Sequence, residues 1–436
     1  MVSAKKSKLS KGGHMKKTVI KVNKKINGKA MEVIAELERD MKRESRLAAI
    51  QALIPLGLKA VEAELQDEIM ELAGGRYGRS GDVKRWGSNP GSVFLGDQKN
   101  KIPVPRARNV VTNEEVTLAS YERLQNAQML DDMALSRVIH GMSQRNYEKA
   151  ATHVPETFGI KKTSICRRFI RASAKKLKEF SERDLSGYDI VAIFIDGKHF
   201  ADNEIVIALG VTIDGEKVLL GFVETNTENH TVCKKFINEF KDRGLNLDHE
   251  ILFVIDGAKG LAKGIKEAMG KKALIQRCQW HKRENVMSYL DKKNQVIFRR
   301  KLQGAYQLPT YDKAKKRLMA IRRELLLINQ SAVASLDEGL EETLTLHRLK
   351  MFEKLGESFK TTNCIENVNK QLAAHTDRVD RWQNSNQRQR WVATAMLSFE
   401  PRLRNVKGFK FLKELREVMK NEVNNKFENQ KLEIAA

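Results

Sequence analysis

The spacing of apolar residues changes character several times along the chain. Between about residues 28 and 74 they recur every three or four positions, which predicts long helices. The following segment, 74–109, is rich in Gly, Pro, Arg and Lys, and it predicts loops and short strands rather than a core. A second helical pattern extends from about Glu114 to Phe180. These patterns predict a largely helical N-terminal part.

The pattern becomes β-rich from Asp189 onward. Three apolar runs with short turns are followed by alternating amphipathic helices and strands, in the order DIVAIFID, EIVIALGVTI, KVLLGFVE, TVCKKFINEFKDRGL, ILFVID, KGLAKGIKEAMG and ALIQRCQWH. This order predicts a mixed sheet in which the first strand neighbours the second and the fourth. Beyond about Arg283 the pattern is helical up to about Leu355.

Two of these strands run into the same tripeptide. VAIFIDGKHF contains Asp196, ILFVIDGAKG contains Asp256, and both place Ile-Asp-Gly at a predicted strand end. On neighbouring strands the two carboxylates would lie side by side, where they repel each other and attract a cation. Mg²⁺ prefers such oxygen ligands. Asp-Gly is also a hairpin signal, but a helix-like segment follows Asp256. Together with the strand order, the pair indicates an RNase H-like nuclease core.

Composition favours a nucleic acid partner. The chain has 436 residues, and 79 Lys and Arg against 55 Asp and Glu give a net charge of +24, which attracts a polyanion. No apolar run of about 18 residues spans a membrane. The four cysteines show no paired spacing, which indicates a reduced, intracellular protein without disulfides.

A basic segment within the second helical block resembles a helix-turn-helix. Residues 147–154 suit one helix, Pro155 to Gly159 supply a break, and Ile160 to Lys178 suit a second helix. The second helix carries eight Lys or Arg, no Asp or Glu, and an apolar stripe of Ile165, Phe169 and Ala172. Such a helix enters the major groove of DNA. A solvated basic face is the alternative. The same two alternatives, DNA contact or solvation, apply to Tyr77 and Trp86 among the arginines of 74–109.

Four motifs carry a family resemblance. IDGKHF, VIDGAKGL, QRCQWHKRENVMSYL and FKTTNCIENVNKQL occur in this order, within a match of about residues 30 to 410. The chain resembles the Mutator-type transposases of bacterial insertion sequences, a branch of the DDE transposases. The resemblance implies a metal-binding catalytic triad of Asp196, Asp256 and Glu366, with two Mg²⁺ or Mn²⁺ ions. It also implies a Cys-x-x-His signature, matched by Cys278 and His281, and an all-helical insertion before Glu366.

Some of these residues have simpler explanations. Asn363 followed by Glu366 is the spacing of a helix capping box, so Glu353 and Glu357 stay as alternative third carboxylates. Cys278 and His281 have half the spacing of a zinc site, but no second half is evident. We expect DNA contacts from thirteen residues: Lys161, Lys162, Arg167, Arg168, Arg171, Lys175, Lys198, His199, Lys259, Cys278, Trp280, His281 and Lys370.

The sequence thus predicts an α/β transposase with an RNase H-like mixed-sheet core, a helical insertion and helical N-terminal DNA-binding domains. Its partners would be double-stranded DNA ends and target, and a second copy of the chain, in a prokaryotic cytoplasm at the nucleoid. The alternatives are a DNA-binding regulator without catalysis and a nuclease or integrase that does not transpose. The expected segments are a basic disordered tail (1–27), a helical region (28–113), a helix-turn-helix-like domain (114–186), the core (187–290 and 359–410), the insertion (291–358) and a basic C-terminal helix or tail (411–436).

Overall fold

The computed structural model describes residues 43–76, 81–95, 98–125, 127–142, 162–200, 203–225 and 229–435. The expected basic tail, Tyr77, the first helix of the helix-turn-helix and Lys161 lie outside these residues. The chain divides into two compact units, and each is described by itself. One unit comprises 1–134 and 143–168, and the other comprises 135–142 and 169–436.

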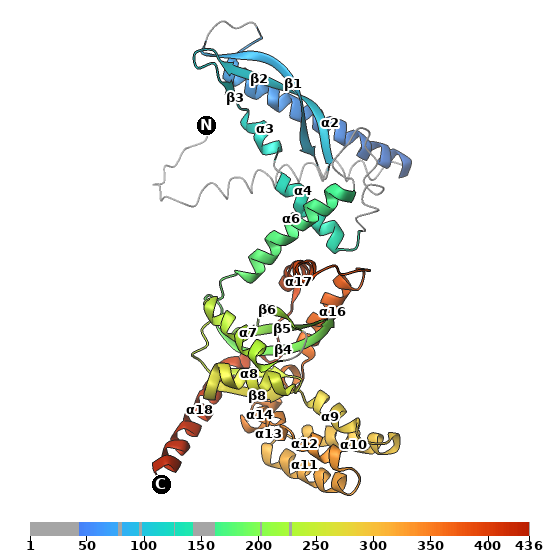
Figure 1. Cartoon of the computed structure of the whole chain (residues 1–436), viewed down its shortest axis with the longest axis vertical. Helices are drawn as coiled ribbons and strands as arrows, with labels where there is room; N and C mark the ends of the chain where they lie inside the picture. Colours follow the sequence, from blue (N-terminus) through green and yellow to red (C-terminus); the bar gives the residue numbers. More distant parts are fainter. Residues whose placement is uncertain are drawn as a thin grey trace, which may run out of the picture. The chain divides into compact units, whose positions relative to one another are not determined.

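The first unit is built on a long β-hairpin. Strands β1 (Val83–Leu95) and β2 (Gln98–Asn109) pair antiparallel, and β3 (Glu115–Val116) adds a short third strand. Helix α2 (Arg43–Ala73) contributes Leu65 and Ile69 to a core shared with Val93 and Ile102. Figure 1 shows α2 lying along the hairpin. The expectation of loops and short strands without a core is therefore wrong, because the apolar residues between the prolines and glycines pack on α2.

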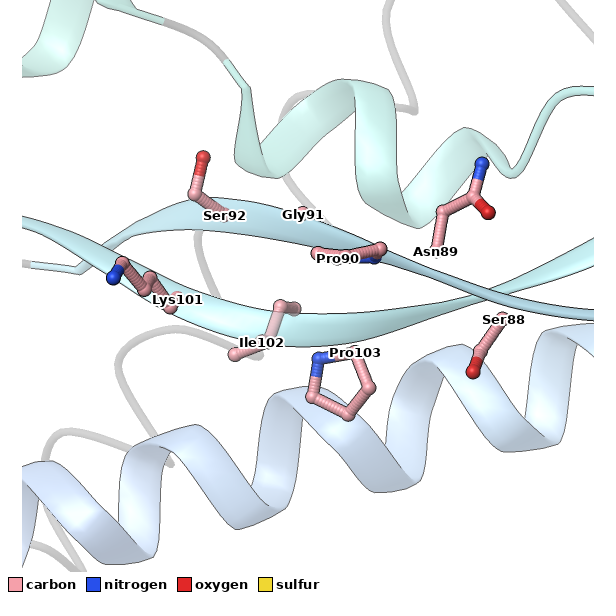
Figure 2. A pocket seen from close by; sticks show the side chains of 8 residues that line it. All are labelled: Ser88, Asn89, Pro90, Gly91, Ser92, Lys101, Ile102 and Pro103. Carbon is pink, nitrogen blue, oxygen red and sulfur yellow. The ribbon is translucent and has the colours of Figure 1, made fainter.

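The middle of the hairpin is hollowed where its prolines lie. Pro90 is paired with Pro103, and since neither has an N–H group, neither can donate to the ladder there. The pocket at this point has a volume of about 640 Å³, and Figure 2 shows its lining residues on both strands. Gly91 is required beside it, because a Cβ atom there would come within 2.3 Å of Val104 Cγ2.

Helices α3 (Ala119–Leu124), α4 (Ala127–Ile139) and α6 (Lys162–Ser181) follow. Helix α6 confirms the predicted second helix of the basic segment within the described residues. Its stripe of Ile165, Phe169 and Ala172 is buried, as the apolar spacing indicated.

The second unit contains the predicted mixed sheet, in the order β6-β5-β4-β7-β8. Its strands are β4 (Ile190–Phe200), β5 (Asn203–Thr212), β6 (Lys217–Thr225), β7 (Ile251–Ile255) and β8 (Ala273–Arg277). β4, β5 and β6 are antiparallel neighbours, whereas β7 runs parallel to both β4 and β8. The predicted strand order is confirmed. β8 ends at Arg277 rather than at His281, because Cys278 caps the next helix.

Successive β4 residues face opposite sides of the sheet. Ile193 and Ile195 pack in a core with α7 (His230–Asp242) and α8 (Lys259–Met269). Phe194 points the other way and stacks on Phe359 of α15, with 5.5 Å between ring centroids. Asp196 has the parity of Phe194, so it lies on the face of β4 that Phe359 of α15 and Asn369 of α16 contact. Figure 1 shows α16 beside the sheet.

The predicted helical insertion is present and has its own core, which includes Phe298, Leu302, Leu318 and Leu336. The helices after β8 are α9 (Gln279–Met287), α10 (Lys292–Tyr306), α11 (Tyr311–Leu326), α12 (Gln330–Asp337), α13 (Leu340–Thr343), α14 (Thr345–Arg348), α15 (Phe352–Phe359), α16 (Asn363–Thr376), α17 (Ser385–Phe399) and α18 (Leu412–Ala435). Short 3₁₀ turns occupy Gly270–Lys272, Glu400–Arg402 and Phe409–Phe411. Within the described ranges, none of the helices combines the length and apolarity needed to cross a membrane.

Candidate active site

Strand register brings Asp196 and Asp256 together. Ile195 of β4 is paired with Ile255 of β7 in parallel, and each aspartate follows directly. Hydrogen-bonded strands lie about 4.8 Å apart, so the two aspartates start from adjacent backbone positions. β4 does not end at Asp196 as the sequence suggested, because it continues to Phe200 paired with β5. β7 ends at Ile255, so Asp256 is the first residue after that strand.

Asp196 is a buried carboxylate among other acidic groups. Its exposed fraction is 8%. Burial, together with the negative charges of Asp256 and Glu366, raises its pKa to about 7, against the opposing effect of His281. Asn369 Nδ2 donates a hydrogen bond to Asp196 Oδ2 across 2.8 Å. Asp256 and Glu366 are thus both near enough to Asp196 to act on it electrostatically.

Glu366 reaches this face from α16, and its surroundings contradict the capping hypothesis. The helix N-cap is Thr362, whereas Asn363 is the first helical residue. The Glu366 carboxylate accepts a hydrogen bond from Thr362 Oγ1 at 2.9 Å. Of the alternative carboxylates, Glu353 is exposed and Glu357 is exposed and ion-paired with Lys407.

Cys278 and His281 lie next to Glu366 through the same threonine. Thr362 Oγ1 is 3.5 Å from Cys278 Sγ and 3.3 Å from His281 Nδ1. Burial disfavours the charged imidazolium of His281, but the hydrogen bond with Cys278 and the charges of Asp256 and Asp196 raise its pKa to about 9. A protonated His281 can donate to the Thr362 hydroxyl, which has one proton of its own to give to Glu366.

The chemistry of this edge suits a hard divalent cation. Asp196, Asp256 and Glu366 offer carboxylate oxygens, and the buried Asn369 Oδ1 atom has no hydrogen-bond partner within the described part of the chain. Among the residues that the structure describes, no group of three or more His, Cys, Asp or Glu side chains is already arranged around a metal position. The three carboxylates are therefore neighbours rather than a preassembled cage.

The residues predicted to contact DNA fall into different environments. Lys162, Arg167, Arg171 and Lys175 are exposed on α6, and Arg168 lies over the Phe94 ring, with 5.8 Å from its guanidinium carbon to the ring centroid.

Around the carboxylates, His199, Lys259 and Lys370 are exposed, and Trp280 is 47% exposed. Lys198 is half-buried and donates to the Asn369 carbonyl oxygen. Cys278 is fully buried as the N-cap of α9, so its side chain is not available to contact DNA as the sequence predicted.

Sequence reasoning missed Thr362 and Asn369. Both lie in the TTNCIENVNKQL motif, and their spacing from Glu366 was the available signal. Residues three or four positions apart share one face of a helix, so Thr362, Glu366 and Asn369 could have been grouped.

Comparison with known proteins identifies the family. The family model described as "Transposase, Mutator family" matches residues 29–401. The transposase for insertion sequence element IS256 in transposon Tn4001 of Staphylococcus aureus is 26% identical over an alignment of 292 residues, with 62% of this chain and 70% of that one covered. The transposase for insertion sequence element ISRM3 of Rhizobium meliloti is 25% identical over an alignment of 328 residues. This alignment covers 73% of this chain and 78% of that one. The chain belongs to the Mutator family of transposases.

Proposed function

We propose that this protein binds the inverted-repeat ends of an insertion sequence and catalyses metal-dependent DNA strand cleavage and strand transfer on an RNase H-like core. The observation that supports this most is the parallel register of Ile195 with Ile255, which sets Asp196 beside Asp256. Asn369 of α16 donates a hydrogen bond to Asp196, and the charge of Glu366 on the same helix acts on that carboxylate.

Each residue of the site has a role in this proposal. Asp196, Asp256 and Glu366 would hold Mg²⁺ or Mn²⁺. When bound, two such ions stabilise charge on the attacking and leaving oxygens of a phosphodiester. Asn369 keeps one oxygen of Asp196 oriented, and Thr362 does the same for Glu366. Water and then a DNA 3′-hydroxyl would attack in line, without a covalent enzyme intermediate.

DNA binding is supported by the distribution of charge. The chain has a net charge of +24. On α6, Arg167, Arg171 and Lys175 recur every four residues and are exposed, whereas Ile165 and Phe169 are buried. A helix with one basic and one apolar face presents its cations to phosphates and base edges. Joining two ends requires two sites, so we propose that the active form is at least a dimer.

A cleavage assay tests the proposal. Duplex DNA carrying the element's own terminal sequence is incubated with the protein and Mg²⁺, Mn²⁺ or Ca²⁺, and products are resolved on a denaturing gel. We expect specific nicking and joined products with Mg²⁺ or Mn²⁺, and binding without cleavage for Asp256→Asn. Nicking without joining would indicate a nuclease that does not transpose. Cleavage by Asp256→Asn at the parent's rate would refute the assignment of the site.

A further inference from the structure

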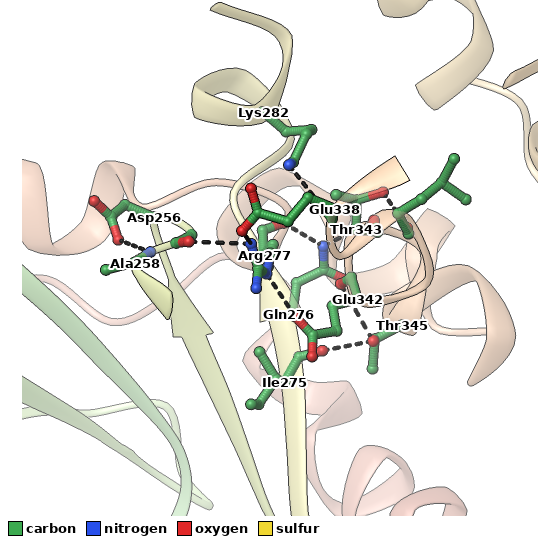
Figure 3. Close-up of polar contacts among 12 residues, drawn as sticks. Asp256, Ala258, Ile275, Gln276, Arg277, Lys282, Glu338, Glu342, Thr343 and Thr345 are labelled. Atoms are coloured by element: carbon green, nitrogen blue, oxygen red, sulfur yellow. Dashed lines mark hydrogen bonds and ion pairs between the residues drawn. The ribbon is translucent and has the colours of Figure 1, made fainter. Parts of the chain in front are cut away.

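A buried arginine connects the loop of Asp256 to the helical insertion. Arg277 is the last residue of β8, and its side chain is 7% exposed. Its Nη1 atom donates to the carbonyl oxygen of Gly257 at 3.0 Å and to Glu338 Oε1 at 3.2 Å. Its Nε atom donates to Glu342 Oε2 at 2.5 Å, as Figure 3 shows. One guanidinium therefore joins β8, the residue after Asp256 and two glutamates of the insertion.

The Gly257 end of this connection fixes the backbone around Asp256. Gly257 has a φ of +127°, a conformation that residues with side chains rarely adopt. Just beyond it, the Ala258 N–H donates to Asp256 Oδ1 at 3.1 Å. The Asp256 carboxylate is thus oriented by a turn whose central carbonyl is held by Arg277.

The turn of the insertion that contacts Arg277 is also held in place. Gly339, between α12 and α13, has a φ of +66°, and a Cβ atom there would come within 2.5 Å of Arg277 Nε. Lys282 of α9 is 3% exposed and donates from Nζ to the carbonyl oxygens of Glu338 and Ser335, at 2.5 and 2.7 Å. The turn from α12 to α13 is therefore held from two sides.

The shape of this contact requires arginine. A guanidinium presents several N–H groups in a fixed plane, whereas a lysine ammonium is a single point charge. Arg277 forms ion pairs with both Glu338 and Glu342. Removing the arginine would leave the half-buried Glu342 carboxylate without this partner. The ion pairs with the two glutamates would be enough for a purely structural role. The further hydrogen bond to the Gly257 carbonyl oxygen links the same guanidinium to the turn after Asp256.

We propose that Arg277 is a positioning residue. It orients the Asp256 carboxylate for cation binding, and it makes this orientation depend on helices α12 and α13. This inference rests on the proposed function, because it assumes that Asp256 binds a cation. A change on the insertion, such as the loss of the Glu342 charge, then weakens cation binding at the sheet without touching the carboxylates themselves.

The test measures the Mn²⁺ concentration that gives half of the metal-dependent rise in melting temperature, for the full chain without DNA. Arg277→Gln and Glu342→Gln are compared with Lys301→Gln, which removes an ion pair with Glu324 between α10 and α11 of the same insertion. We expect the half-saturating concentration to rise about tenfold or more for the first two variants, as for other supports of metal ligands, and to be unchanged for the control. The Mn²⁺ dependence of cleavage should shift in parallel.

Three outcomes separate the possibilities. If Arg277→Gln lowers the melting temperature without metal but keeps the parent's half-saturating concentration, Arg277 is only structural and the inference fails. If Arg277→Gln does not fold, Glu342→Gln decides by the same criterion. If Asp256→Asn responds to Mn²⁺ as the parent does, the proposed metal site is wrong, and the inference falls with it.

Discussion

Asn369 of α16 donates a hydrogen bond to Asp196 of β4, with 2.8 Å between Nδ2 and Oδ2. The donor is an amide, so it orients the buried carboxylate without cancelling its negative charge. Asn369 is itself fixed through its backbone, since its carbonyl oxygen accepts from Lys198 Nζ at 3.1 Å. This arrangement leaves the charge of Asp196 available to a cation.

We expect Asn369→Ala to lose cleavage while keeping DNA affinity. Without the amide, the Asp196 carboxylate has no fixed orientation, and the loss of a partner that orients a metal ligand costs roughly 10–100-fold in activity. Cleavage rate and gel-shift affinity should be measured side by side. The control is Asn367→Ala, which changes an exposed asparagine of the same helix. Equal cleavage rates for the two variants would show that Asn369 has no role in the site.

We expect Glu366→Gln to fold and bind end DNA as the parent does, and to fail in cleavage. Glutamine keeps an oxygen that accepts from Thr362 Oγ1, but it lacks the negative charge that Mg²⁺ requires. Melting temperature, end binding and cleavage with Mg²⁺ and with Mn²⁺ test this. Glu353→Gln and Glu357→Gln serve as controls, because both residues are exposed on α15. If Glu366→Gln cleaves normally while a control is inactive, the third carboxylate is misassigned.

The central sheet could be predicted from the sequence because its signals are local. Each strand is a short apolar run, and the Ile-Asp-Gly repeat marks where two of them meet. The contacts around Glu366 are not local. Thr362 and Cys278 are 84 residues apart, and Asn369 and Asp196 are 173 residues apart. The helical insertion lies between them, and its length does not reveal where the chain returns to the sheet.

The hairpin of the first unit was mispredicted for a different reason. Proline and glycine weaken a strand on average, and Pro90, Gly91 and Pro103 fall in its centre. A two-stranded ribbon tolerates them where prolines face each other and α2 supplies a core. Val93 and Ile102 are buried against that helix, a tertiary effect that single-residue preferences do not contain.

The exposed stripe of α6 predicts how DNA affinity depends on salt. We expect the double variant Arg167→Ala, Lys175→Ala to bind end DNA more weakly and to flatten the plot of log K against log salt. If each side chain neutralises one phosphate, the slope should fall by about 1.8. Fluorescence anisotropy across a series of salt concentrations gives this slope.

The control for the stripe is Lys178→Ala on the same helix, whose ammonium is 3.8 Å from Glu182. Its charge is already partly compensated, so we expect a smaller change in slope. An unchanged slope in the double variant would assign α6 to a solvated surface instead of a DNA interface.

The hydroxyl of Thr362 should be needed for cleavage, because it contacts Glu366, Cys278 and His281 together. Thr362→Val keeps the shape of this fully buried side chain and removes the hydroxyl. Glu366 then loses its donor, and we expect cleavage to fall roughly 10-fold or more. Thr362→Ser keeps the hydroxyl and should cleave much faster than the valine variant.

The adjacent residue offers a matched control for this last experiment. Thr361 is also buried, but its hydroxyl finds no hydrogen-bond partner among the residues that the structure describes. Removing an unpaired hydroxyl from a buried site costs no hydrogen bond, so Thr361→Val should keep the parent's cleavage rate and at least its stability. Melting temperature and single-turnover cleavage are measured for all three variants. If Thr361→Val and Thr362→Val cleave equally fast, the Thr362 hydroxyl does not orient Glu366, and the link from His281 to the third carboxylate has no catalytic meaning.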